Sequence, residues 1–415
     1  MPTPPSPIVP LPAPERRGIR AESPQAVTFV ELFFDLVFVF AITQLTVLTA
    51  HDLTPGGILR SILLGWLIWW AWTQFTWTLN PADTTHPAVR VVTLTATGVA
   101  LVMAASVPRA FAEDALWFAV PYVVVRVIGL GLQVRVDLER EDTGAGATGH
   151  GGVVRWATLS MVGLVFVLIG SVVDPSIRPA VWLLAIVADL VAAAIAARRT
   201  VWDLNPAHLS ERHGLFVIIA IGESLIVAGT AVANDERTTA LAVAAVGAIL
   251  GACLLWWTYF GWLKDALEHG IAAAAPERLG PLARDAFSLA HFPLIGGIVG
   301  FAVAIEEIVA HPEAPAPAEV VAALGIGVTL FVACSALSLR LLGGPVLMPR
   351  LAILAAMLVG LVVVTSMPPA WPLGVVAAAL LAIVLVEGGG ARVRVVASGS
   401  PRDVADPDVA EQATA

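Results

Sequence analysis

Long apolar segments are the feature that most constrains how this chain folds. A helix needs about 20 mostly apolar residues to cross a bilayer, and twelve segments approach that length. The chain of 415 residues is 58% hydrophobic and 13% charged, with a mean hydropathy of +0.85, whereas soluble domains carry about 25% charged residues. We therefore predict an all-α polytopic membrane protein of about 12 transmembrane helices. The expected spans are residues 27–49, 58–78, 88–108, 112–134, 153–173, 178–197, 212–233, 239–262, 285–308, 317–340, 350–367 and 371–388.

The distribution of basic residues predicts the orientation of these spans. With the N-terminus placed inside, 18 of the 23 basic residues fall in inside segments and four in outside segments, and Arg126 lies in mid-span. Cytoplasmic loops carry the excess of Lys and Arg. We expect both termini in the cytoplasm. Arginine occurs 22 times and lysine once, a bias associated with GC-rich bacterial genomes, so we expect a multi-pass protein in the plasma membrane of a bacterial cell.

Several sequence features recur in the same order in the two halves of the chain. A Trp-Trp segment occurs in spans 58–78 and 239–262, a His followed by Pro accompanies spans 88–108 and 285–308, and Glu31 and Glu211 precede or begin corresponding spans. An even number of spans per half makes such repeats parallel, related by an axis along the membrane normal. We predict two six-helix repeats, residues 27–200 and 201–389, between disordered cytoplasmic tails, residues 1–26 and 390–415.

Two acids interrupt the first apolar segment. Glu31 and Asp35 lie four residues apart, so they share one face of a helix. A carboxylate inside a membrane is costly unless it has a partner or faces water. Either both acids lie at the headgroup level and are solvated, or they belong to an ion, proton or substrate route.

Four further charges lie in or beside apolar segments. Arg212 and Glu223 are eleven residues apart and share a helical face; Glu223 makes a structural hydrogen bond or belongs to a route. Arg126 needs a carboxylate partner, for which Asp35, Asp189 and Glu223 are the candidates. The candidate pathway residues are therefore Glu31, Asp35, Arg126, Asp189, Arg212 and Glu223.

The sequence offers little support for other site classes. Glu307 and His311 have a spacing compatible with a bound cation, but solvation in a loop is the favoured account. The two cysteines both lie in apolar segments, which leaves no disulfide framework or zinc cluster. No phosphate-binding loop, dinucleotide fingerprint or nucleophile motif occurs. We expect no enzyme activity, cofactor or metal, and no nucleic-acid partner, because basic residues are sparse.

Two stretches resemble a known family. ELFFDLVFVFAITQLT at 31–46 and HLSERHGLFVIIAIGESL at 208–225 are similar to the bacterial low temperature requirement A proteins. The resemblance implies that Glu31, Asp35, His208, Glu211, Arg212, Gly222 and Glu223 are family-pattern positions, and that His213 stands where an aromatic residue is usual. The name of the family implies a role during growth in the cold.

The first span also resembles that of the potassium channels with a Phe-Ser-Asp motif. The similar stretch is 33–43, but Phe34 replaces the serine and the preceding arginine is absent. Potassium selectivity therefore does not follow.

These observations favour movement of a small ion or solute, with protons or monovalent cations first. The alternative is a non-transporting membrane protein that supports membrane or envelope function in the cold. The expected partners are the lipid bilayer and the transported ion or solute, and a homo-oligomer is compatible with the sequence.

Overall fold

The computed structural model describes residues 18–21, 23, 25–112, 114–142, 150–197, 202–234 and 238–398. Throughout these ranges the secondary structure is helical, apart from one isolated bridge between Arg20 and Ala82. Most of both predicted tails, residues 1–17 and 399–415, lies outside the described residues. The prediction of an all-α protein is confirmed for the described chain.

Fourteen α-helices are present in the described ranges, with a short 3-10 helix (Val107–Arg109) after α3 and a π-helix (Arg284–Leu289) before α11. Each of the twelve predicted segments falls on a helix. The helices are α1 Phe29–His51, α2 Pro55–Leu79, α3 Pro87–Ala105, α4 Ala115–Asp142, α5 His150–Val172, α6 Arg178–Ala197, α7 Pro206–Asn234, α8 Thr239–Phe260, α9 Leu263–Ala272, α10 Pro276–Ala283, α11 His291–Ala310, α12 Ala318–Leu341, α13 Met348–Val364 and α14 Ala370–Ser398.

Among the described residues, ten helices or helix runs have the length and composition to cross a membrane. The two predicted spans outside this set are α2 and α13. Helix α13 has only 17 residues, and α2 carries Arg60, Gln74 and several hydroxyl side chains that lower its hydropathy. The protein is thus helical with ten candidate membrane-spanning helices, and the count of twelve stays a prediction.

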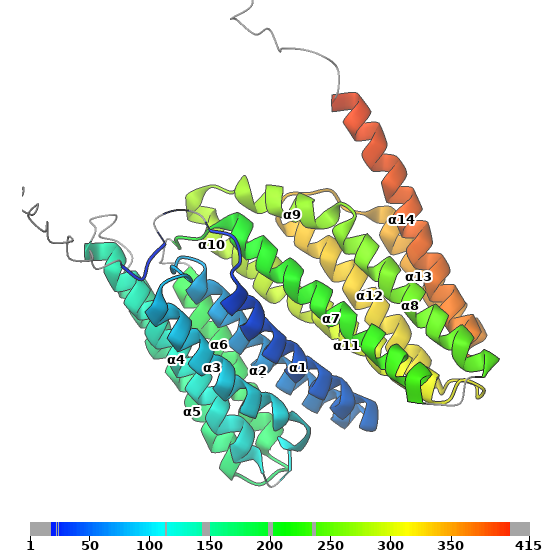
Figure 1. Ribbon diagram of the computed structural model, residues 1–415, viewed down its shortest axis with the longest axis horizontal. Helices are drawn as coiled ribbons and strands as arrows, with labels where there is room; N and C mark the ends of the chain where they lie inside the picture. The colour runs from blue at the N-terminus through cyan, green and yellow to red at the C-terminus, as the bar shows by residue number, and fades with distance from the viewer. Residues whose placement is uncertain are drawn as a thin grey trace, which may run out of the picture.

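The helices form two groups that lie side by side, α1–α6 and α7–α14 (Figure 1). In the first group α1 packs on α2 and α3, α3 on α4, and α5 on α4 and α6; in the second α7 packs on α8 and α11, α11 on α12, and α13 on α12 and α14. The groups meet where α1 and α2 contact α7 and α11. Helices α1 and α7 are therefore central to the molecule.

Local sequence sets where these two central helices begin. Thr28 and Glu31 form a capping box at the start of α1, in which each side chain binds the backbone of the other end of the turn. Helix α7 starts at Pro206, six residues before the predicted span, because Asn205 Oδ1 accepts hydrogen bonds from the N–H groups of Ala207 (3.1 Å) and His208 (3.3 Å). This added turn includes His208, whose side chain is buried.

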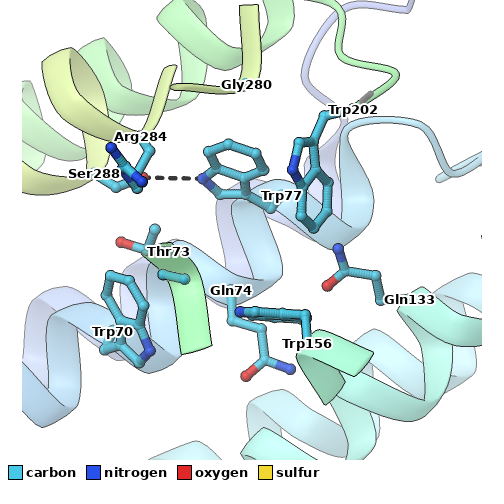
Figure 2. Close-up of a pocket in the computed structure, with 11 residues that line it drawn as sticks. Trp70, Thr73, Gln74, Trp77, Gln133, Trp156, Trp202, Gly280, Arg284 and Ser288 are labelled. Carbon is cyan, nitrogen blue, oxygen red and sulfur yellow. Dashed lines mark hydrogen bonds between the residues drawn. The ribbon is translucent and has the colours of Figure 1, made fainter. Parts of the chain in front are cut away.

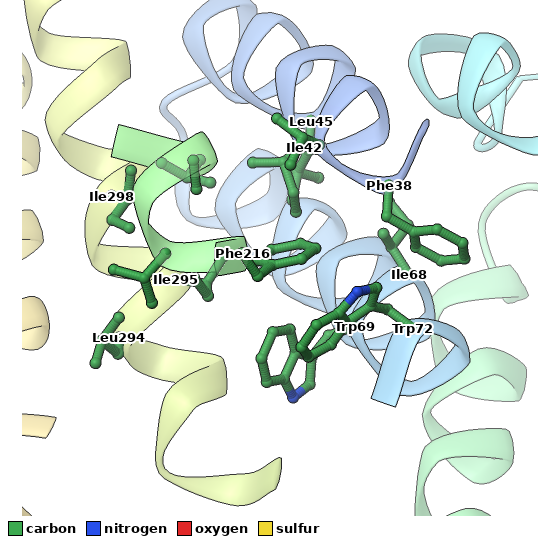
Figure 3. Packing of buried hydrophobic residues seen from close by; sticks show 14 of the residues in the cluster. Phe38, Ile42, Leu45, Ile68, Trp69, Trp72, Phe216, Leu294, Ile295 and Ile298 are labelled. Carbon is green, nitrogen blue, oxygen red and sulfur yellow. The ribbon is translucent and has the colours of Figure 1, made fainter. Parts of the chain in front are cut away.

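Apolar side chains fill the junction between the groups (Figure 3). Phe38 and Ile42 of α1, Trp69 of α2, Phe216 of α7 and Ile295 of α11 are all less than 4% exposed. Phe216 follows Arg212 by one helical turn and Phe38 follows Asp35 by about one turn. The apolar packing therefore begins directly beyond the charged residues at the starts of α1 and α7.

Candidate functional site

Charged side chains from the first turns of α1 and α7 meet across the junction. His208 Nε2 lies 3.1 Å from Glu31 Oε1, and Arg212 Nη1 lies 3.4 Å from the same oxygen. The other oxygen of Glu31 accepts hydrogen bonds from the backbone N–H and the hydroxyl of Thr28, both at 2.9 Å. Since the third residue of each helix reaches the other helix, α1 and α7 run in the same direction.

Asp35 extends this cluster by one turn of α1. Its Oδ1 accepts hydrogen bonds from Arg212 Nη2 and from Trp72 Nε1, the latter at 2.7 Å. The guanidinium of Arg212 also lies over the Trp72 ring, 5.8 Å from its centroid, in the range of cation–π contacts. We call Glu31, Asp35, His208 and Arg212 the junction network.

The junction network is buried and incompletely bonded. All four side chains are at most 1% exposed, while Asp35 Oδ2 and Arg212 Nε make no hydrogen bond within the described structure. Two carboxylates face one guanidinium, so one negative charge is in excess when His208 is neutral. Buried charges are ordinarily compensated by a partner, whereas the network carries one uncompensated negative charge in this protonation state.

One further acid borders the junction network. Glu211 is half-buried and its Oε2 accepts a hydrogen bond from the N–H of Val27 at 3.2 Å. It adds negative charge at the edge of the network. Counting Glu211 with the junction network therefore increases its excess of negative charge.

Beside the junction network, aromatic and histidine rings continue away from Trp72. Its ring centroid is 5.0 Å from that of His213, which is 5.3 Å from that of His291. His291 Nε2 lies 2.9 Å from the Tyr259 hydroxyl. These buried groups connect α7 with α8 and α11.

Arg126 and Asp189 form a separate pair inside the first group. Asp189 Oδ2 and Oδ1 accept hydrogen bonds from Arg126 Nη1 and Nη2, both at 3.0 Å, and Nη1 also donates to Tyr122 (2.8 Å). Gln74 accepts a hydrogen bond from Arg126 Nε and returns one to its carbonyl oxygen. The expected carboxylate partner of Arg126 is present, and it is Asp189 rather than Asp35 or Glu223.

Glu223 lies apart from both clusters. It is half-buried and eleven residues beyond Arg212, a distance of about 16 Å along α7. It lies close enough to Glu306 for the two acids to repel each other, near the end of α1 and α11 opposite to the junction network. The six predicted pathway residues therefore occupy three places: Glu31, Asp35 and Arg212 meet in the junction network, Arg126 pairs with Asp189, and Glu223 lies apart.

The amino-acid sequence of the chain is similar to those of known proteins. The model of the family described as bacterial low temperature requirement A protein (LtrA) matches residues 26–385. This chain belongs to the LtrA family. The chain is also similar to an uncharacterized protein of Rhizobium meliloti (strain 1021), with 31% identity over 294 residues that cover 69% of this chain and 70% of the relative. No solved structure matches the chain.

The two LtrA sequence stretches are the ones that build the junction network. The stretch at 31–46 supplies Glu31 and Asp35, and the stretch at 208–225 supplies His208 and Arg212. His213, at the position where the resemblance implies an aromatic residue, makes an edge contact with Trp72. A histidine at this position thus keeps the ring packing of the site.

Sequence reasoning overlooked one buried pair in the LtrA chain. Arg350, the first residue of the predicted span 350–367, is 1% exposed and donates to both oxygens of Glu387. It also donates to Ser335 Oγ and to the Thr258 carbonyl, each at 3.0 Å. Glu387 directly precedes a glycine run at the end of the predicted span 371–388, a position from which we did not expect a largely buried side chain.

The described residues hold no group of three or more His, Cys, Asp and Glu side chains placed to bind a metal ion. The predicted contact between Glu307 and His311 is present at 3.1 Å, with both side chains well exposed. This exposure favours a solvated surface pair.

Proposed function

We propose that this LtrA protein is a proton-linked transporter of a small cation or solute, and that the junction network holds the proton. The observation that carries the proposal is the unbalanced charge of the network, two carboxylates against one guanidinium, at full burial. A charge in a membrane interior is costly unless it is compensated. One proton on His208 or on a carboxylate neutralises the network.

A transporter fits the surroundings of the network better than an open channel. The apolar side chains beyond Asp35 and Arg212 are almost completely buried (Figure 3). Water and ions therefore meet a packed layer on that side of the network. A change in the packing of α1 and α2 against α7 and α11 is needed to open it, which is the behaviour of a carrier with alternating access.

The proposal includes twelve spans in two parallel halves with the network between them. The parallel direction of α1 and α7 and the matching helix contacts of the two groups support this arrangement. In parallel-repeat transporters the substrate site lies at the interface of the halves. Arg126–Asp189 and Arg350–Glu387 would then hold each half together internally.

A non-transporting role is the second candidate, because the network also joins the two groups of helices like a structural clamp. Flux into liposomes that contain the purified protein separates the two. With a pH-sensitive dye inside and an imposed membrane potential, the transporter predicts proton uptake by the wild-type protein and loss of uptake in Asp35→Asn. Asparagine keeps the shape and an acceptor for Trp72 and Arg212 but removes the excess charge.

The matched control is Glu313→Gln, which neutralises an exposed acid in the segment between α11 and α12. Gel-filtration profiles verify that each variant is folded. Uptake by folded Asp35→Asn at the wild-type rate would rule out the network as the proton site. Absence of uptake by the wild-type protein would favour the clamp.

A further inference from the structure

A cavity of about 50 Å³ lies between α2 and the α10–π-helix segment (Figure 2). Four tryptophans line it: Trp70 and Trp77 of α2, Trp156 of α5 and Trp202 just before α7. A cavity needs about 10–15 Å³ to hold one water molecule, so this one has room for several waters or for a small ligand. The cavity lies outside the junction network and shares only Gln74 with the surroundings of the Arg126–Asp189 pair.

Three of the indole rings form a cage. Trp77 and Trp202 meet edge to face with centroids 5.1 Å apart and an interplanar angle of 82°, and Trp156 and Trp202 do so at 6.2 Å and 87°. Perpendicular rings present π-faces on several sides of one space. Such aromatic cages are the recurrent means of binding quaternary ammonium groups.

The rest of the lining consists of small and polar residue types. Apart from the four tryptophans, it contains Ala193, Gly280 and polar side chains, and no Leu, Ile, Val or Met. The one charged lining residue is Arg284, whose Nε and Nη2 both lie 2.7 Å from Asp285 Oδ1. Its charge is therefore balanced within the same turn.

Two buried donors of the cavity lining have no partner. Trp70 Nε1 and Thr73 Oγ1 make no hydrogen bond in the described structure, and their side chains are 5% and 4% exposed. A buried donor without a partner costs about 1–3 kcal/mol. By contrast, Trp77 Nε1 donates to Ser288 Oγ of the π-helix at 3.0 Å, and π-helical turns are frequent at functional sites.

Two further cavities lie between this cavity and the end of the molecule where α1 and α7 begin. Trp77, Gln133 and Trp202 also line a second cavity of about 30 Å³. Arg20 and Asp203, which form an ion pair, line both that cavity and a basin of about 690 Å³ beyond it. The three cavities therefore lie one beyond another between the indole cage and the predicted cytoplasmic side, with shared side chains between them.

We propose that this cavity binds a small organic cation with a methylated ammonium group and an oxygen acceptor at its other end. The ammonium group lies among Trp77, Trp156 and Trp202, and the oxygen accepts hydrogen bonds from Trp70 and Thr73. In this assignment the cation is the transported substrate, so that part rests on the proposed function. Binding itself is measured without any gradient.

The test measures equilibrium binding of tritiated choline to the purified wild-type protein. Saturable binding is expected, and 3,3-dimethylbutan-1-ol, which has the shape of choline without its charge, should compete at least about tenfold more weakly because a desolvated cation–π contact is lost. Equal competition by this neutral alcohol, or no saturable choline binding, would overturn the proposal.

Variants test the two ends of the ligand separately. Trp156→Leu should weaken choline and tetramethylammonium alike, by about tenfold or more. Trp70→Phe should weaken choline by up to about tenfold through the lost hydrogen bond and leave tetramethylammonium, which has no acceptor, unchanged. The matched control is Trp257→Leu, which changes an exposed indole on α8 and should leave both affinities unchanged.

The outcomes separate this inference from the proposed function. Asp35-dependent proton uptake by a protein that does not bind choline would contradict only the assignment of the cavity to an organic cation. Choline binding by a protein without proton uptake would contradict only the proposed proton-linked transport. An equal loss of both ligands in Trp70→Phe would contradict the assigned orientation.

Discussion

Removal of the carboxylate of Asp189 is the perturbation whose cost the structure defines most clearly. Asp189→Asn takes away the charge that accepts two hydrogen bonds of 3.0 Å from Arg126. A hydrogen bond to a charged group contributes about 1.5–3 kcal/mol, so the two together contribute about 3–6 kcal/mol. This agrees with the cost of about 3–5 kcal/mol for breaking a buried pair.

We therefore expect Asp189→Asn to lower the free energy of unfolding by about 3–5 kcal/mol, which corresponds to roughly two to three and a half orders of magnitude in the folded-to-unfolded ratio. Equilibrium unfolding of the purified protein in mixed detergent micelles measures this change. The double variant Arg126→Met with Asp189→Leu removes both charges and should recover most of the loss.

The double variant also serves as the control for volume and polarity at this position. An Asp189→Asn protein with wild-type stability would refute the reasoning, because Arg126 would then be compensated without its carboxylate. A double variant no more stable than the single one would show that packing, rather than the uncompensated charge, sets the cost.

Three further predictions follow from the packing and the charge pattern. Gly297→Ala should reduce the yield of folded protein, because a Cβ there would lie 2.5 Å from the carbonyl oxygen of Gly327 on α12. Gly296→Ala adds a Cβ in open space and should leave the yield unchanged, and gel filtration compares the yields of the two variants. Glu387→Gln should lower the thermal unfolding midpoint by weakening the contact with buried Arg350, and a midpoint equal to that of the exposed-site variant Glu313→Gln would count against it. Reporter fusions at the two termini should both report the cytoplasm, and a periplasmic signal from either would reverse the orientation.

The sequence is sufficient to predict the long apolar helices, because length and hydropathy decide which segments can cross a membrane. The short helices α9 and α10, between two predicted spans, were not predicted. All twelve predicted segments fall on helices, and the family resemblance is confirmed. Boundaries depend on local caps, and Asn205 moves the start of α7 by six residues. The π-helix before α11 has no signal in hydropathy.

The candidate site was predictable only in part. The spacing of Glu31 and Asp35 places them on one face of α1, but their partners His208 and Arg212 lie more than 170 residues away. Such pairing depends on how the two groups of helices dock, which a single sequence does not encode in any local pattern. The same holds for the indole cage, whose rings come from α2, α5 and the segment before α7.

The central claim is that the junction network takes up one proton. Infrared difference spectroscopy of the purified protein between low and high pH tests it directly, because protonation of a buried carboxyl or imidazole group changes its vibrational bands. The account predicts a protonation signal in the wild-type protein and in Glu313→Gln that is absent from folded Asp35→Asn, in which the charges of the network are already balanced. Identical difference spectra of the wild-type protein and Asp35→Asn would contradict the account.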